Sequence, residues 1–305
     1  MVIDRFLAGE PRGLARAISR CESGTGAAIM RAVYGRAGHA LTVGLTGPPG
    51  VGKSTLSGAL VRLARAASKT VGVVSVDPSS PFSHGAILGD RIRLTEHFTD
   101  ADVFIRSMAS RGHLGGLAGA TADAVALMDA FGKDVVIVET VGVGQSEVEI
   151  AELADTTIVV LQPGSGDSIQ LLKAGILEVA DVFVVNKSDH PTALQLQREI
   201  RAMLEMQDMH GWVPPLVPTQ ASACLGVDVL WQAILAHGEY LRATGTLAEK
   251  RRLAFAHQVR ALAVGRLEDR VDVELAGLQH AVLGEDPYAV AERVIARIAG
   301  SPHDE

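Results

Sequence analysis

The chain has 305 residues, of which 48% are hydrophobic, and its formal net charge at pH 7 is −7. This length and composition allow one large domain with an appendage, and the net negative charge argues against nucleic-acid binding, which needs basic patches. No apolar run is long enough to cross a membrane, and the start lacks a basic-then-apolar signal pattern. The two cysteines, Cys21 and Cys224, lie far apart in the sequence, which disfavours a disulfide framework. We therefore expect a cytoplasmic protein with a sizeable hydrophobic core.

The first 40 residues carry a helical pattern. Pro11 suits the start of a helix, and Leu14, Ile18 and Cys21 recur at helical spacing. We expect a helical extension over residues 1–40.

The segment that follows combines an apolar run, a glycine-rich loop and a helical pattern. Leu41–Leu45 is typical of a buried strand, and Gly47–Ser54 matches the phosphate-binding loop G-x-x-x-x-G-K-[ST] in full. Glycines let the backbone turn several N–H groups towards phosphate oxygens. Lys53 adds a positive charge for the outer phosphates, and the Ser54 hydroxyl can bind magnesium. We expect a nucleoside triphosphate with Mg²⁺, contacted by Gly47, Pro49, Gly50, Val51, Gly52, Lys53, Ser54 and Thr55.

Six more short apolar runs follow, most of them separated by helical stretches. Near-continuous apolar runs are typical of parallel strands buried on both faces, and their alternation with helices indicates an α/β fold with a mostly parallel sheet flanked by helices. A helix over residues 230–241 closes this domain, which we place at residues 41–242. The runs are Val71–Val76, Val103–Ile105, Val135–Val138, Thr157–Leu161, Val182–Val185 and Leu216–Pro218.

The motif Asn186-Lys187-Ser188-Asp189 directly follows the strand pattern at residues 182–185. A carboxylate at this strand end can accept two hydrogen bonds from the ring N–H and the exocyclic amine of guanine. Adenine presents the opposite pattern and would leave the carboxylate unpaired, which is costly when it is desolvated. A surface turn is the alternative interpretation of so short a motif. We expect guanine to be bound by Asn186, Lys187 and Asp189, with Ser222, Ala223 and Cys224 beside the base.

Carboxylates at strand ends are candidates for the magnesium site. Asp77 and Glu139 end two strand patterns, and Asp90 is a third candidate farther along the chain. Carboxylates beside a phosphate loop hold Mg²⁺ directly or through water, although a helix cap or an ion pair would also explain each of them. The backbone N–H of Gly142 is a candidate contact to the γ-phosphate and would sense its loss. Lys53, Asp77, Asp90 and Glu139 are thus candidate catalytic residues.

The residue that orients the attacking water is not evident. In small GTPases a glutamine follows the γ-phosphate-sensing glycine, but Val143 occupies that place and cannot orient water. Gln145 lies nearby and is either a second candidate or an ordinary loop residue before a helix. We infer slow unassisted hydrolysis, with the missing groups supplied by a moving loop or a partner.

Two glycine-rich stretches, residues 110–116 and 162–167, are expected to be mobile loops. Arg111 in the first, and Lys173 after the second, could each stabilise charge at the phosphates or contact a partner. A solvated loop charge and a helix-surface lysine are equally good interpretations of these two residues. The ten histidines lack metal-site spacing, and the glycine-flanked His113 is the one of functional interest.

The tail has a helical character throughout. A long amphipathic stretch runs from Thr246 to Leu267, and a second helix starts at Asp286-Pro287 and stops at Gly300. We expect a helical appendage over residues 243–305.

Six ordered motifs resemble those of the MeaB/ArgK GTPases, chaperones of adenosylcobalamin-dependent acyl-CoA mutases such as methylmalonyl-CoA mutase. The likeness covers most of the chain, from LARAISRCESG near the start to the helical tail. The motifs are GLTGPPGVGKST, VDPSSPFSHGAILGDRIRL, SMASRGHLGGLA, VVIVETVGVGQSE, LQPGSGDSIQLLKAGILEVAD and VNKSD.

This resemblance implies a P-loop NTPase fold with helical extensions at both ends and homodimerisation through the C-terminal helices. It also implies a GTPase that binds a mutase, gates cobalamin loading and protects or rescues the enzyme, without a tightly bound organic cofactor of its own. Residues 77–90 and 139–145 would be nucleotide switches, and residues 164–173 a further switch that couples hydrolysis to the mutase. Carried over by position, Lys53, Ser54, Asp77, Asp90 and Glu139 serve phosphate and magnesium, Asp189 binds guanine, and Asp167 and Lys173 are coupling candidates.

Two departures from the family pattern fall in the switches. His84 stands where the family usually has a small residue, which bears on the shape of the first switch. Ser168 stands where an acidic residue is common, which bears on the coupling mechanism and on the choice of mutase.

Two other functions stay open. A metallochaperone-type GTPase shares this core but would need a cysteine/histidine metal site, and none is visible in the sequence. A transport-associated protein kinase would transfer phosphate to a protein rather than to water.

Overall fold

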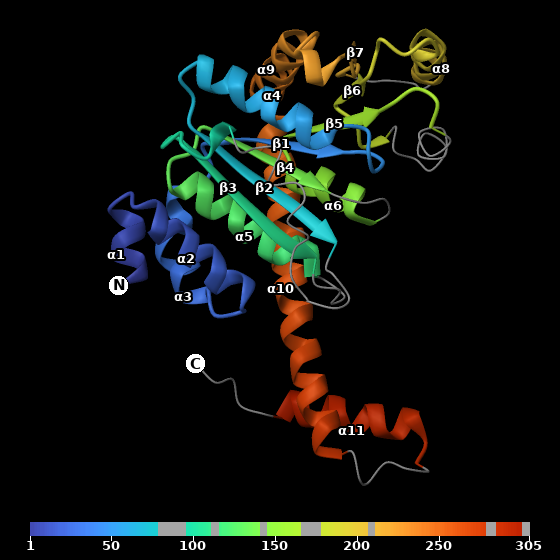
Figure 1. Ribbon diagram of the computed structural model, residues 1–305. Helices are drawn as coiled ribbons and strands as arrows, with labels where there is room; N and C mark the ends of the chain where they lie inside the picture. The colour runs from blue at the N-terminus through green and yellow to red at the C-terminus, as the bar shows by residue number, and fades with distance from the viewer. Residues whose placement is uncertain are drawn as a thin grey trace.

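The computed structural model describes residues 1–78, 96–110, 116–140, 145–165, 178–206, 211–278 and 285–300 (Figure 1). For residues 77–78, 109–110, 116–118 and 145–148 the description is of the backbone only.

Seven strands form one sheet in the order β3-β2-β4-β1-β5-β6-β7, and every neighbouring pair is parallel. Each of the seven apolar runs in the sequence corresponds to a strand, which confirms the predicted α/β class and the parallel sheet. The strands are β1 (Leu41–Thr46), β2 (Val71–Pro78), β3 (Val103–Ser110), β4 (Val135–Thr140), β5 (Thr156–Leu161), β6 (Val182–Val185) and β7 (Leu216–Pro218).

Strand β3 is longer than the apolar run that predicted it. The run ends at Ile105, whereas the strand continues through Arg106 to Ser110. Because β3 is the edge strand of the sheet, it is covered less completely and tolerates polar residues. Arg106 is stabilised by an ion pair with Glu22 of the N-terminal helices.

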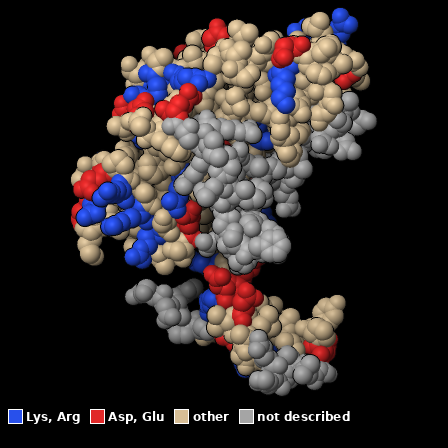
Figure 2. All heavy atoms as spheres, viewed as in Figure 1, with Lys and Arg blue, Asp and Glu red and all other residues tan. Residues whose placement is uncertain are grey.

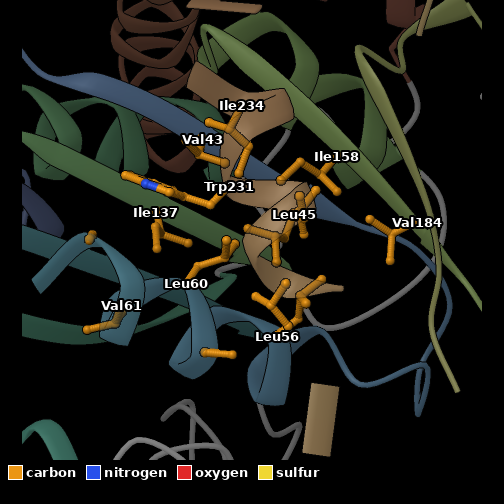
Figure 3. Packing of buried hydrophobic residues seen from close by; sticks show 14 of the residues in the cluster. Val43, Leu45, Leu56, Leu60, Val61, Ile137, Ile158, Val184, Trp231 and Ile234 are labelled. Atoms are coloured by element: carbon orange, nitrogen blue, oxygen red, sulfur yellow. The ribbon is translucent and has the colours of Figure 1, made fainter. Parts of the chain in front are cut away.

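Helices cover both faces of the sheet. On one face, α4 (Lys53–Ala66) and α9 (Val227–Thr244) pack in one apolar cluster against strands β1, β2, β4, β5, β6 and β7 (Figure 3). The other face is covered by α5 (Gly116–Ala130), α6 (Gln145–Leu153) and α8 (Ala193–Glu205).

Strand alternation explains how one run of residues can serve both layers. In β1, Val43 and Leu45 pack with α4, while Gly44 points to the opposite face. A Cβ at Gly44 would lie 2.8 Å from Ile150 of α6. Gly44 thus allows α6 to approach β1 closely, next to the phosphate loop.

The N-terminal extension belongs to the main core. Its helices are α1 (Val2–Leu7), α2 (Pro11–Glu22), α3 (Ala27–Val33) and the 3₁₀ turn η1 (Tyr34–Arg36). Phe6, Leu14 and Ile18 are almost fully buried and join the cluster that includes α5. The ring of Phe6 packs edge-on against Phe131, with centroids 5.3 Å apart.

The C-terminal extension consists of a long helix whose far end projects from the body and a shorter helix that lies across that end (Figure 1). Gly245, in a left-handed conformation, separates α9 from the long helix α10 (Thr246–Leu278). This helix ends at Leu278 instead of the expected Leu267, because α11 (Pro287–Gly300) packs back against its far end through a small apolar cluster.

Acidic side chains gather where the C-terminal helices leave the body, and uncharged surface lies beyond them (Figure 2). Several apolar side chains along α10 are between 44% and 72% exposed. They include Leu253, Phe255, Val259, Leu262, Leu267 and Val273.

Candidate functional site: a nucleotide site at the C-terminal edge of the sheet

The centre of the sheet is a topological switch point. Strand β1 lies between β4 and β5, and the helices that follow β1 and β4 cross to opposite faces of the sheet. Open α/β sheets bind their ligands at such a point, beyond the carboxyl ends of the strands. The phosphate loop leaves β1 at this position.

Three glycines give the loop its shape. Gly47, Gly50 and Gly52 have φ angles of 137°, 76° and 97°, which residues with a Cβ rarely adopt. A Cβ at Gly47 would also collide with the carbonyl oxygen of Val160 in β5. The loop therefore lies directly against the sheet and ends at Gly52, the N-cap of α4.

Lys53 and Ser54 begin α4, and each is only 6% exposed. The ammonium of Lys53 donates to the carbonyl oxygens of Gly47 at 2.6 Å and of Pro48 at 2.9 Å, so the charge lies over the loop. The first backbone N–H groups of a helix lack helical partners, and the helix dipole favours an anion there. A buried lysine at such a helix terminus is suited to phosphate.

Residues 186–189, in which we expect guanine recognition, are called the guanine motif. Asn186 joins this motif to the phosphate loop. Its Nδ2 donates to the Val51 carbonyl at 2.7 Å, and its Oδ1 accepts from Thr219 Oγ1 at 3.1 Å and from Ala221 N at 3.0 Å. A Cβ on Gly52 would collide with the same Nδ2. With 3% exposure, Asn186 is a structural link between three loops.

Lys187 and Asp189 occupy the turn after Asn186, and both are exposed. The Lys187 ammonium donates to the Gly50 carbonyl at 3.0 Å and to Gln162 Oε1 at 2.6 Å. The structure thus brings Lys187 to the phosphate loop, while the Asp189 carboxylate faces solvent beside it.

The segment after β7 forms the 3₁₀ turn η4 (Ala221–Ala223), with Ser222, Ala223 and Cys224 exposed. Cys224 has a left-handed backbone, and its sulfur accepts a hydrogen bond from Arg62 Nη2 at 2.9 Å. The bond from Ala221 N to Asn186 fixes this turn next to the guanine motif.

Glu139 ends β4 and is 1% exposed. Its Oε1 accepts a hydrogen bond from Ser75 Oγ at 2.6 Å, and it is level with Leu45 of β1 in the sheet register. Strand alternation places it on the face covered by α4, the helix that carries Ser54. A carboxylate and a hydroxyl are ligands that Mg²⁺ prefers, so this donor set fits the ion.

Several predicted residues lie outside the described part. For Asp77 and Gln145 only the backbone is described, at the end of β2 and the start of α6. The others are Asp90, Arg111, His113, Gly142, Val143, Asp167 and Lys173, together with the departures His84 and Ser168.

Two residues of the site were missed by sequence reasoning. Arg62 of α4 bonds Cys224 and Glu96, and Gln162 bonds Lys187. Arg62 belongs to no motif, whereas Gln162 lies in the motif LQPGSGDSIQLLKAGILEVAD, directly after a strand, but received no role of its own.

The described residues lack two other features, a metal cluster and a membrane-spanning helix. They contain no group of three or more histidine, cysteine, aspartate or glutamate side chains that could hold a metal ion. No helix among them is both long and apolar enough to span a bilayer.

Comparisons with known proteins place the chain in a family. The family described as methylmalonyl-CoA mutase-associated GTPase MeaB matches residues 14–276. The chain is 44% identical over 310 residues to a putative GTPase of Pyrococcus horikoshii, covering 98% of each. It is 37% identical over 260 residues to the GTPase ArgK of Escherichia coli, covering 82% of this chain and 78% of that one.

A solved structure has the same architecture. The crystal structure of a LAO/AO transport system kinase matches with a TM-score of 0.70 and 27% identity, covering 98% of this chain and 96% of that one. The sheet of this chain and its helical extensions therefore recur in a relative over almost the full length. From the matched family, these relatives and the phosphate loop, we conclude that the chain belongs to the MeaB family of methylmalonyl-CoA mutase-associated GTPases and is a GTP hydrolase.

Proposed function

We propose that this GTPase is a chaperone of an adenosylcobalamin-dependent acyl-CoA mutase of the methylmalonyl-CoA type. It binds the mutase, gates loading of the cobalamin cofactor and protects or reactivates the enzyme. The support for this partner is the family description, which names methylmalonyl-CoA mutase. We also propose a cytoplasmic location, in keeping with the two unpaired cysteines.

The observation that carries the nucleotide part is the bond from Asn186 to the Val51 carbonyl. It joins the guanine motif to the phosphate loop, so one ligand with a guanine base and a phosphate chain can touch both. Asp189 accepts from the ring N–H and the exocyclic amine of guanine, and Ser222, Ala223 and Cys224 flank the base.

The phosphate end is bound by the chain in two ways. The backbone N–H groups of residues 50–55 meet the phosphate oxygens at the N-terminus of α4. The Lys53 ammonium exchanges the carbonyls of Gly47 and Pro48 for the outer phosphates. This exchange replaces neutral acceptors by charged ones, which form the stronger hydrogen bonds.

Ser54 and Glu139 are the described residues that we propose for Mg²⁺, with Asp77 and Asp90 as further candidates. When bound, the ion neutralises charge that develops on the phosphates during transfer. The bond from Ser75 orients the Glu139 carboxylate before any ligand arrives, which reduces the cost of ordering it.

Hydrolysis by the isolated protein should be slow, because Val143 stands where small GTPases have the water-orienting glutamine. The missing groups would come from Arg111, His113, Gln145, Asp167 or Lys173, or from the mutase itself. Slow GTP turnover that the mutase accelerates would keep the protein in its GTP-bound state until the mutase is bound.

We further propose a homodimer formed through the C-terminal helices. The exposed apolar residues of α10 support it, because several large apolar side chains at 44–72% exposure on one helix are costly in water. Light scattering should give the mass of a dimer, and a monomer at micromolar concentration would contradict this part of the proposal.

The decisive experiment measures GTP turnover with and without candidate mutases, together with their co-purification. We expect one mutase to bind and to accelerate phosphate release from GTP. If no mutase binds or accelerates turnover, the chaperone role is wrong even if the protein hydrolyses GTP.

Labelled GTP in the same experiment separates the protein-kinase alternative. The label should appear in inorganic phosphate, and transfer of the label to a protein would favour a kinase. Stoichiometric binding of nickel by the isolated protein would favour a metallochaperone instead.

A further inference from the structure

Gln162, the residue after β5, is bonded to the guanine motif but has no role in the site as proposed above. Its Oε1 accepts a hydrogen bond from Lys187 Nζ at 2.6 Å, and the same ammonium donates to the Gly50 carbonyl at 3.0 Å. We propose that Gln162 is a positioning residue for guanine recognition: it holds Lys187, and Lys187 fixes the turn that carries Asp189. This inference rests on the proposed recognition of guanine by Asp189.

The turn needs support from outside because its first residue has an uncommon backbone. Lys187 has a φ of 54°, in the left-handed region that side chains other than those of asparagine and aspartate seldom adopt. Conformations of this kind persist where surrounding contacts fix them. Here the His190 N–H closes the turn on the Lys187 carbonyl at 3.0 Å, and the ammonium is bonded at the other end of the side chain.

Asp189 depends on this turn for its position. Its carboxylate is exposed, and within the described ranges it makes no hydrogen bond or ion pair that would hold it. A carboxylate that must accept two parallel hydrogen bonds from guanine gains affinity when it is held in place beforehand. The backbone of the turn is what holds it, so a contact that fixes Lys187 also orients Asp189.

The chain after Gln162 passes close to the same turn at a second point. Gly164 has a φ of 73°, and a Cβ built on it would lie 3.6 Å from His190 Cε1. The segment after β5 therefore contacts the turn through Gln162 at Lys187 and passes close to it at His190.

The test compares the affinities for GTP and ITP, because ITP lacks the exocyclic amine that Asp189 should bind. Q162L keeps the size of the side chain and removes the acceptor, whereas Q162E keeps an acceptor oxygen. We expect the preference for GTP over ITP to fall about fivefold in Q162L, the usual effect of one lost hydrogen bond. Q162E should restore the preference, since its added charge affects both nucleotides alike.

Q195L is the matched control, because Gln195 is exposed and bonds Glu199 one turn farther along α8. It should leave the GTP preference unchanged, and thermal unfolding without nucleotide should show that all variants are folded. A wild-type protein that binds GTP and ITP equally would overturn the guanine assignment of Asp189. A wild-type preference that persists in Q162L, or a loss that Q162E fails to restore, would overturn the role of Gln162 alone.

Discussion

The C-terminal edge of the sheet, where the strands end, and the N-terminal edge, where they begin, hold charged side chains in different surroundings. At the C-terminal edge, the Lys53 ammonium donates to the neutral carbonyls of Gly47 and Pro48. At the N-terminal edge, the carboxylate of Asp155 meets a full set of partners. Arg251 of α10 donates to both of its oxygens, at 2.9 and 2.8 Å, and the Thr42 N–H donates at 2.9 Å.

The difference indicates that the charge of Lys53 serves ligand binding, whereas the charge of Asp155 serves the stability of the fold. A phosphate at a helix N-terminus offers charged acceptors to a cation that donates to loop carbonyls. A buried carboxylate that already has a guanidinium and a backbone N–H gains nothing from a ligand and costs much if a partner is lost. Variants at the C-terminal edge should therefore lower the affinity for GTP, and variants at the N-terminal edge should lower the free energy of unfolding.

Lys53→Ala should give the largest effect. The variant loses the cation that the outer phosphates require, so we expect the affinity for GTP to fall by about 100-fold or more. Unfolding of the nucleotide-free protein should change by less than about 1 kcal/mol, because the lost hydrogen bonds go to loop carbonyls that water can reach once the side chain is removed. Calorimetric titration and urea unfolding measure the two quantities.

Lys69→Ala is the control for this variant. Lys69 is an exposed lysine whose ion pair with Asp134 spans 3.7 Å, so it should change neither measurement appreciably. If Lys53→Ala unfolds the ligand-free protein and Lys69→Ala does not, Lys53 is needed for the fold and the contrast between the edges fails.

The sheet and the local motifs could be predicted from the sequence because their signals are local. Strands buried on both faces must be almost continuously apolar, and the phosphate loop and guanine motif have fixed spacing. The features that could not be predicted have one cause, because each depends on contacts between residues far apart in the chain. The bond of Gln162 to Lys187, and that of Asp155 to Arg251, join residues 25 and 96 positions apart. The length of α10 was missed because α11 stabilises its far end.

Arg251→Ala should have the second-largest effect, at the N-terminal edge. It leaves Asp155, which is 4% exposed, without its counter-charge. We expect a loss of about 2 kcal/mol in the free energy of unfolding, less than for a fully enclosed pair because Arg251 is partly exposed. The affinity for GTP should stay within about twofold of wild type, since RT ln 2 is only about 0.4 kcal/mol.

Arg252→Ala is the neighbouring control, because Arg252 pairs with Glu249 on the exposed side of the same helix. The loss in the free energy of unfolding should be much smaller than for Arg251→Ala, because an ion pair in water contributes little. Equal losses in the two arginine variants would contradict the special role of the buried carboxylate.

The smallest effect is expected from the pH dependence of stability at the same edge. His237 is 1% exposed, and its ring nitrogens face Thr156 at 2.9 Å and Asp181 at 3.3 Å. Burial lowers the pKa of His237 below its ordinary value of 6.5, an effect larger than the opposite one of the Asp181 carboxylate. Lys250 also faces this group, bonded to Asp181 at 2.9 Å.

Because the folded state binds the proton less readily than the unfolded chain, the contribution of His237 is complete above pH 6.5 and is lost as the pH falls towards its lower folded pKa. His237→Gln removes this titration, so the stability difference between wild type and variant should shrink when urea unfolding is repeated from pH 7.5 down to 5.5. The same measurement on His39→Gln, at an exposed histidine near the same edge, shows how much of any change is specific to His237. A His237 difference that stays constant over this range would mean that the imidazole takes up its proton without cost, and that this edge tolerates an added positive charge.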